Sequence, residues 1–238
     1  MARAGRSRAA ATQARLDRTD RDAMIAAVVA QTAATATVTG RATLNPRVLA
    51  ALSRVRREAF VPAADAGLAY VNTSLPIGHG QTILQPFLVA LMTELLDLSS
   101  NDVVLEIGTG SGYHTAILAA LAHKVFSVEV FPDLVRRARH ILAREGCRNV
   151  AIRCGDGALG WPEHAPYDAI LVGAAVDRVP PALLAQLRAG GRMVIPIADG
   201  DHAQRLVLIN KDALGAVRQY PMLPVTLVPL VETAADAG

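Results

Sequence analysis

The feature that most constrains this chain is a glycine-rich loop between a predicted strand and a predicted helix. Residues 103–107 are apolar and β-branched enough for an interior parallel strand, and residues 113–122 are helix-forming. Glu106 precedes glycines at every second position from 108 to 112. Glycine lets the backbone turn tightly and approach a ligand without a Cβ clash, so this loop predicts a cofactor site.

The spacing of the glycines favours one kind of cofactor. A dinucleotide-binding loop would read Gly-x-Gly-x-x-Gly, but Tyr113 stands at the third glycine of that pattern. The loop instead reads Glu-x-Gly-x-Gly-x-Gly, which resembles the first motif of the Rossmann-like methyltransferases. That resemblance implies S-adenosyl-L-methionine as cofactor and S-adenosyl-L-homocysteine as product, with the loop around the amino-acid part of the cofactor.

Acidic residues follow the next two predicted strands. Glu129 lies near the carboxyl end of strand 124–130, where its side chain can accept two hydrogen bonds from a ribose diol. Asp156 lies between glycines after strand 149–154, suited to an adenine amino group or to a neighbouring backbone amide. Each acid alone is also typical of a solvated loop or a helix cap. Their recurrence at successive strand ends favours a ligand, because open α/β sheets bind ligands at those ends.

Strands and helices alternate from residue 103 onward. The predicted elements cover 103–107, 113–122, 124–130, 132–145, 149–154, 168–173, 179–188 and 191–197. Such alternation predicts an α/β fold with a Rossmann-like, doubly wound, mostly parallel sheet. Three strand-like segments without helices between them, 205–210, 215–220 and 225–231, are expected to form an antiparallel C-terminal edge.

Composition and the segments before residue 103 indicate how the chain is divided into domains. Of the 238 residues, 52% are hydrophobic, which suffices for one methyltransferase domain over 41–238. Residues 1–40 are expected to form a flexible Arg/Ala-rich tail and a first helix. Asn45 and Pro46 predict the start of another helix, the segment from 69 to 85 reads as a long irregular loop, and Pro86 opens the next helix.

Several classes of protein are disfavoured. No apolar run approaches the ~20 residues that span a bilayer, and the run at 23–30 is a poor signal peptide. Cys147 and Cys154 form no Cys-x-x-Cys pair and belong to no Cys/His cluster, so we expect reduced thiols and no metal. We therefore expect a cytoplasmic protein, monomeric, that acts without nucleic acid or membrane.

The loop before the cofactor motif identifies a family. Residues 69–86 resemble the signature loop of the protein-L-isoaspartate O-methyltransferases, which methylate the free carboxylate of isoaspartyl residues in damaged proteins. The likeness covers about residues 44–232. Further matching segments lie at 55–62, 105–113, 155–157, 166–170, 190–196 and 227–231. The resemblance implies protein repair as the function and isoaspartyl-containing proteins or peptides as substrates.

The same resemblance implies roles for particular residues. The cofactor-binding positions are Glu106, Gly108, Thr109, Gly110, Gly112, Glu129, Asp156 and Gly157. The substrate-binding positions are His79, Gln81 and Ile83, and the catalytic positions are Thr82 and Leu84.

Leu84 departs from the family pattern. The family loop has a serine there, regarded as an active-site residue, and leucine can neither donate nor accept a hydrogen bond. Thr82, His79 or backbone amides at the start of the Pro86 helix are candidate replacements. The alternatives are a divergent relative that methylates another carboxylate, in a modified peptide or a small acid, and a cofactor-binding protein with little catalysis. A nicotinamide oxidoreductase and a nucleic-acid methyltransferase are disfavoured by Tyr113 and by the absence of a basic stripe.

Overall fold

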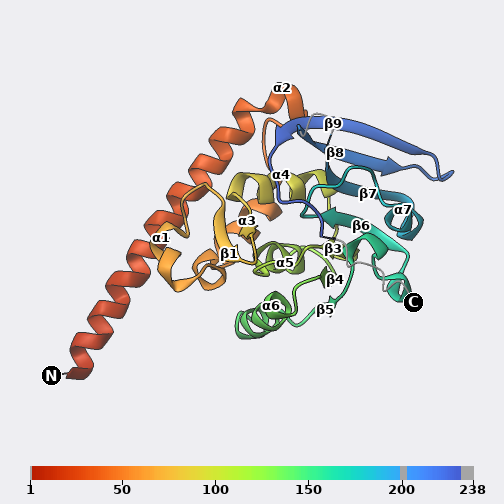
Figure 1. Ribbon diagram of the computed structural model, residues 1–238. Coiled ribbons are helices and arrows are strands. Elements are labelled where there is room, and N and C mark those ends of the chain that lie inside the picture. Colours follow the sequence, from red (N-terminus) through yellow and green to blue (C-terminus); the bar gives the residue numbers. More distant parts are fainter. Residues whose placement is uncertain (1, 199–202, 232–238) are drawn as a thin grey trace.

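A seven-stranded sheet forms the centre of the protein (Figure 1). The computed structural model describes residues 2–198 and 203–231, with side chains from residue 18 onward. The strands lie in the order β5-β4-β3-β6-β7-β8-β9. Their bounds are β3 Val103–Ile107, β4 Lys124–Glu129, β5 Val150–Cys154, β6 Tyr167–Val172, β7 Leu187–Ala198, β8 Gln204–Lys211 and β9 Val217–Val225. The first five are parallel and the last two antiparallel, so the predicted fold is confirmed.

The chain reverses direction across the sheet at β3. After β3 it runs outward through α5 (Tyr113–Ala119), β4, α6 (Pro132–Arg144) and β5, and it then returns to place β6 on the other side of β3. The carboxyl ends of β3 and β6 therefore flank a topological switch point, where open α/β sheets bind their ligands.

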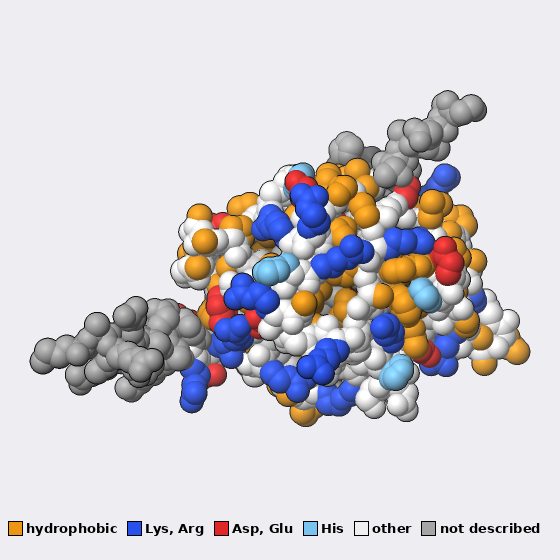
Figure 2. Space-filling view, turned by 90° about the horizontal axis from the view of Figure 1, so that it is seen from below, with side chains coloured by type: hydrophobic (Ala, Val, Ile, Leu, Met, Phe, Trp, Pro, Cys, Tyr) orange, Lys and Arg blue, Asp and Glu red, His pale blue; other side chains and the backbone are white. Residues whose placement is uncertain are grey.

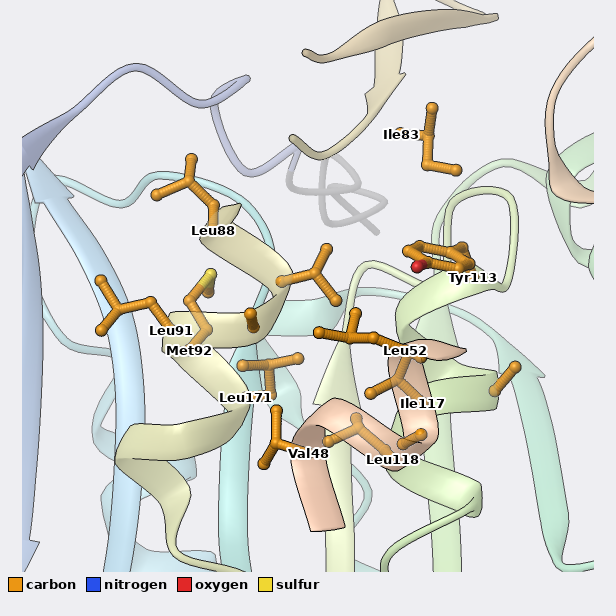
Figure 3. Close-up of a cluster of buried hydrophobic side chains, with 14 of the residues drawn as sticks. Val48, Leu52, Ile83, Leu88, Leu91, Met92, Tyr113, Ile117, Leu118 and Leu171 are labelled. Carbon is orange, nitrogen blue, oxygen red and sulfur yellow. The ribbon is translucent and has the colours of Figure 1, made fainter. Parts of the chain in front are cut away.

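Helices cover one face of the sheet with a continuous apolar core (Figure 3). This layer includes α3 (Pro46–Arg54), α4 (Pro86–Leu96), α5 and α6. Leu52 of α3 and Ile117 and Leu118 of α5 belong to this core, where the two helices contact each other, and all three side chains are buried (Figure 3). The opposite face packs against α7 (Pro181–Gln186) and short 3₁₀ turns at Gly157–Leu159 and Pro162–His164. Asn45 accepts a hydrogen bond from the amide of Arg47, which confirms it as the cap of α3.

One long helix occupies the N-terminal region. The sequence predicted a tail ahead of a first helix, whereas the structure has a continuous helix, α1, over Ala2–Ala34, followed by the short α2 (Ala36–Thr39). The beginning of α1 extends away from the rest of the protein (Figure 1). Met24 and Val28 are buried where α1 crosses the domain. The division of the chain near residue 40 stays a prediction.

Two expectations are corrected. The loop before α4, beyond the 3₁₀ turns Arg57–Phe60 and Ala63–Leu68, contains a β-hairpin of β1 (Leu75–Gly78) and β2 (Gln81–Ile83). The sequence shows no alternation of apolar and polar residues there, because the two strands have only 4 and 3 residues. The segment after Val225 is not an edge strand. It turns back toward the switch point, where the amide of Leu230 donates to the carbonyl of Ala175.

Basic side chains are spread over the face that contains α6, among neutral and apolar ones (Figure 2). Many of these guanidinium groups have partners. Arg136 pairs with Asp133, whereas Arg139 donates to the carbonyl of Ile152. Arg137 donates to the carbonyl of Ile77 and so ties α6 to the hairpin. These arginines therefore serve local packing as well as surface charge.

Removing the buried Leu52 side chain should destabilise the protein strongly. We expect Leu52→Ala to lower the free energy of unfolding by about 2–5 kcal/mol, because a cavity would open between α3 and α5. Urea denaturation measures the change. Leu214→Ala is the matched control, since Leu214 is 96% exposed and should change stability by less than about 0.5 kcal/mol. Equal losses in the two variants would contradict this packing.

Candidate active site

The glycine loop after β3 adopts a conformation that favours glycine. Gly108, Gly110 and Gly112 have φ values of 89°, 55° and 90°. A side chain at Gly112 would press on Leu142 of α6, so this glycine serves helix packing. A side chain at Gly110 would lie 3.3 Å from the Ile77 side chain of the hairpin. The loop thus approaches both α6 and the hairpin closely.

Glu129 holds the loop in place. Its carboxylate lies at the end of β4 and is 5% exposed. One oxygen accepts from the amide of Gly110 at 2.8 Å, and the other accepts from the amide of Phe131 at 3.0 Å. Each carboxylate oxygen has a second lone pair, so Glu129 can still accept from a ligand hydroxyl.

Glu106 lies below the loop in a buried hydroxyl network. Its Oε2 accepts from Thr115 and from Ser127, each at 2.6 Å. Because the Ser127 proton is used in this way, the Thr109 hydroxyl 2.5 Å away must donate to Ser127. Among the described residues, Oε1 of Glu106 has no hydrogen-bond partner. Burial raises the pKa of Glu106 to about 7, although the two hydroxyl bonds act against this shift.

His114 is a second buried titratable group beside Glu106. The Thr93 hydroxyl donates to the carbonyl of Val89 at 2.7 Å, so it accepts from Nε2 of His114 at 2.9 Å. His114 therefore carries a proton on Nε2. Burial lowers its pKa to about 3.

The hairpin faces the glycine loop across a cavity of about 40 Å³. Thr82, Ile83 and Leu84 form one wall of this first cavity. Its opposite wall contains the loop. The lining there comprises Glu106, Gly108, Thr109, Gly110, Ser111, Tyr113 and His114, with Val89, Leu171 and Gly173. The hairpin turn that presents this wall has positive φ at both His79 and Gly80, as a tight two-residue turn requires.

A second cavity of about 30 Å³ lies on the other side of Gly108. Glu129, Phe131 and Gly157 line it, together with Gln81 of the hairpin. The returning terminal segment, residues 229–231, closes it. No side chain fits at Gly157, because a Cβ there would lie 2.4 Å from the Ile107 side chain.

The structure brings most of the predicted site residues to these two cavities. The exceptions are Gly112, Asp156 and His79. Asp156 accepts from the amide of Ala158 and caps a 3₁₀ turn, one of the two roles the sequence suggested. His79 stacks on Phe131 at the hairpin tip and lies 3.6 Å from Asp133. The functional roles of all these residues stay predictions.

Some lining residues carry no sequence signal. Ser111 lies between two glycines of the loop and His114 lies at the start of the predicted helix, but nothing in the sequence marks either side chain as lining a cavity. Leu171 and Gly173 reach the cavity only because β6 lies beside β3, which is a property of strand order. Within residues 2–198 and 203–231, no group of three or more His, Cys, Asp or Glu side chains is arranged to hold a metal ion. No helix in the described part of the chain is long and apolar enough to cross a membrane.

Comparisons with known proteins agree with this geometry. The family model for protein-L-isoaspartate(D-aspartate) O-methyltransferase matches residues 34–235. Protein-L-isoaspartate O-methyltransferase 2 of Syntrophobacter fumaroxidans is 50% identical over 191 residues, covering 80% of this chain and 77% of that protein. Protein-L-isoaspartate O-methyltransferase 1 of Cupriavidus necator is 50% identical over 208 residues, covering 87% and 80%.

Two solved structures share the fold. One is a protein-L-isoaspartate O-methyltransferase with a TM-score of 0.75 and 27% identity, covering 92% of this chain and 67% of that chain. The other is a Plasmodium falciparum protein described as a putative protein-L-isoaspartate O-methyltransferase in complex with S-adenosyl-L-homocysteine. It has a TM-score of 0.69 and 24% identity and covers 79% of this chain and 92% of that chain.

The fold and the cavities at its switch point define a Rossmann-like methyltransferase that depends on S-adenosylmethionine. More specifically, the chain belongs to the protein-L-isoaspartate(D-aspartate) O-methyltransferase family. The resemblance drawn from the loop sequences is thereby confirmed.

The two buried groups predict an unusual pH dependence of stability. Glu106 keeps its proton in the folded protein between pH 4.5 and about 7, so its contribution to stability falls as pH rises. His114 stays neutral in the folded protein between about 3 and 6.5, while the unfolded chain binds a proton, so its contribution rises with pH. Over the shared interval the two effects oppose one another.

Glu106→Gln should remove one of these effects. We expect the free energy of unfolding to rise with pH more steeply than in the unmodified protein, by up to about 1.4 kcal/mol per pH unit. Urea denaturation at about pH 5 and about pH 6 measures this slope. Glu163→Gln is the control, because Glu163 is an exposed acid paired with Arg153. An unchanged slope in Glu106→Gln would show that Glu106 is ionised throughout.

Proposed function

We propose that this protein transfers the methyl group of S-adenosylmethionine to the free α-carboxylate of L-isoaspartyl residues, and so acts in the repair of damaged proteins. The observation that carries the proposal is the first cavity, in which the hairpin wall Thr82–Leu84 faces the glycine loop after β3. A substrate held by the hairpin would meet a cofactor held by the loop at this point. Its partners are then proteins or peptides that contain isoaspartyl residues.

The residues that line the two cavities suit the cofactor. Glu106 lines the first cavity and its Oε1 has no hydrogen-bond partner among the described residues, which suits the α-ammonium group of the cofactor. Gly108 and Gly110 leave room for its amino-acid part, and Glu129 at the second cavity suits the ribose hydroxyls. Gly157 and the apolar groups of the second cavity suit the adenine ring. When bound, S-adenosylmethionine supplies an electrophilic methyl group and leaves as S-adenosylhomocysteine.

The cavities are smaller than this ligand requires. Their volumes of about 40 and 30 Å³ hold only water-sized groups. Binding of the cofactor therefore requires the groups that line these cavities to shift. Side-chain changes on binding are common, and a substantial minority of complexes also rearrange loops.

The reaction needs little from the protein by way of acid or base chemistry. A carboxylate with an ordinary pKa near ~3.9 is already ionised at neutral pH. One of its oxygens forms a bond to the methyl carbon as the carbon–sulfur bond breaks, so a negative and a positive charge disappear together. Apolar walls from Ile83, Leu84 and Val89 exclude water from the place where this happens. Orientation of the substrate is then the main contribution of the hairpin.

The leucine at position 84 also favours a second candidate function. Among the replacements suggested for the family serine, Thr82 lines the cavity, whereas His79 points toward Asp133. The amides at the start of α4 are already bonded, that of Gln85 to the Ser74 hydroxyl and that of Phe87 to Asn72. With fewer donors at this wall, the pocket also suits a divergent family member that methylates a different carboxylate, in a modified peptide or a small acid.

We further propose a cytoplasmic, monomeric enzyme that works on protein substrates without nucleic acid or membrane. The pairing of Arg136 with Asp133 on α6, and of Arg153 on β5 with Glu163, supports the absence of a nucleic-acid surface, because these charges are partly used within the protein.

Substitutions at Leu84 test the catalytic proposal. We expect the unmodified chain to methylate an isoaspartyl peptide and not its aspartyl twin, and Leu84→Ser to raise kcat/KM about tenfold to a hundredfold by restoring one hydrogen-bond donor. Transfer of labelled methyl measures both. Leu84→Ala isolates the hydroxyl from the change in volume. If every variant binds the cofactor but none methylates the isoaspartyl peptide, the repair function is wrong and the second candidate stands.

Glu129→Gln tests the cofactor site. The amide group would set an N–H donor against one of the two backbone amides and weaken the acceptor for ribose, so we expect S-adenosylhomocysteine to bind roughly tenfold to a hundredfold more weakly. Isothermal titration calorimetry measures the affinity. Glu163→Gln, on the exposed surface, should bind normally. Unchanged binding by Glu129→Gln would remove Glu129 from the cofactor site.

A further inference from the structure

The side-chain oxygen of Gln31, on helix α1, accepts two hydrogen bonds from the segment 69–85, which contains the hairpin. Asn72 Nδ2 donates to it at 2.9 Å, and Gln85 Nε2 donates to it at 3.1 Å. Gln31 precedes residue 34, where the family match begins. A residue outside the matched region therefore contacts both ends of the segment that carries the hairpin.

The direction of these hydrogen bonds follows from the backbone. Asn72 Oδ1 accepts from the amide of Phe87 at 3.0 Å, and a backbone amide can only donate, so the NH₂ group of Asn72 must face Gln31. Gln85 Nε2 also donates to the backbone carbonyl of Asn72 at 3.1 Å, and a carbonyl can only accept. Both neighbours thus present N–H groups, and only an acceptor at position 31 satisfies them.

This network fixes the start of α4. Pro86 has no amide proton, and Gln85 makes no side-chain capping bond of its own. The cap comes from Asn72 across the loop, and the Ser74 hydroxyl accepts from the amide of Gln85. Leu84 lies directly before Gln85. Its place in the first cavity therefore depends on bonds that end at Gln31.

Helix α1 is a firm anchor for Gln31. Met24, Val28 and Thr32 are buried, and their spacing puts them on the side of the helix that packs on the domain (Figure 1). Arg21, three turns earlier, donates to the Tyr70 hydroxyl at 2.7 Å at the beginning of the same loop. The helix therefore holds the loop at two points.

We propose that Gln31 is a positioning residue for the substrate side of the active site, acting through Asn72 and Gln85 on the hairpin wall. This inference rests on the proposed function, because it assigns the wall to the isoaspartyl substrate. This role requires a hydrogen-bond acceptor at position 31, and it does not require a donor there. A glutamate side chain has nearly the same length as that of glutamine and can accept both hydrogen bonds. A methionine side chain has a similar length but lacks the acceptor oxygen.

The test compares Gln31→Met and Gln31→Glu with the unmodified full chain. For Gln31→Met we expect kcat/KM for an isoaspartyl peptide to fall about tenfold, with the KM for S-adenosylmethionine changed by less than about twofold. Gln31→Glu should retain activity within about threefold of the unmodified chain. Val29→Ala, an exposed position on the same helix, is the matched control. Hydrogen exchange of residues 72–87 should accelerate in Gln31→Met alone.

Three results would overturn the inference. They are normal peptide kinetics and exchange in Gln31→Met, equal impairment in Gln31→Glu and Gln31→Met, and an equal rise in both KM values, which would mean general destabilisation. If the unmodified chain fails to methylate the isoaspartyl peptide, the proposed function fails separately. Hydrogen exchange in the two variants then still decides whether Gln31 positions the loop.

Discussion

The parallel pairing of β3 with β4 on one side and β6 on the other is the constraint on which the rest of the structure depends. Because the chain leaves β3 in one direction and returns from the other, no crossover covers the carboxyl end of β3. The glycine loop fills that position. Its close approach to the hairpin leaves little room for a side chain at 110, and the positive φ values at 108 and 110 favour glycine at both positions. Glu129, from the neighbouring strand, then ties the loop at Gly110. The topology of the sheet thus leaves a crevice at the carboxyl end of β3, and hydrogen bonds such as that of Glu129 with Gly110 fix the loop that lines it.

The central sheet could be predicted from sequence because its middle strands β3 and β6 are buried on both faces and read as apolar runs. The bounds of β3 and the capping of α3 by Asn45 were predicted correctly, since both depend on neighbours in the chain. The strand-like segment 225–231 was assigned to the edge for the same local reason. Its apolar residues are instead used to close the second cavity, and only the path of the chain in three dimensions reveals that.

The site could be predicted only in part, and the limit has a physical cause. Positions within one motif, such as Glu106 and Gly108, are adjacent along the chain, so their pattern is visible in the sequence. The cap of α4 is not, because Asn72 lies 15 residues from the amide it accepts from, and Gln31 lies 54 residues from Gln85. Hydrogen bonds between side chains that are distant in sequence leave no periodicity. Residues that position a site through such bonds are therefore found only in the structure.

The electrostatics of the first cavity are consistent with a reaction that consumes charge. His114 is neutral across the physiological range, and burial favours the neutral form of Glu106 until a cation approaches its free oxygen. A cofactor with an ammonium and a sulfonium group would stabilise the ionised form of Glu106, so binding would release a proton. The anion required by the reaction then comes from the substrate carboxylate. Under these conditions a hydroxyl at position 84 serves only to orient that carboxylate, and an apolar leucine leaves the chemistry itself intact.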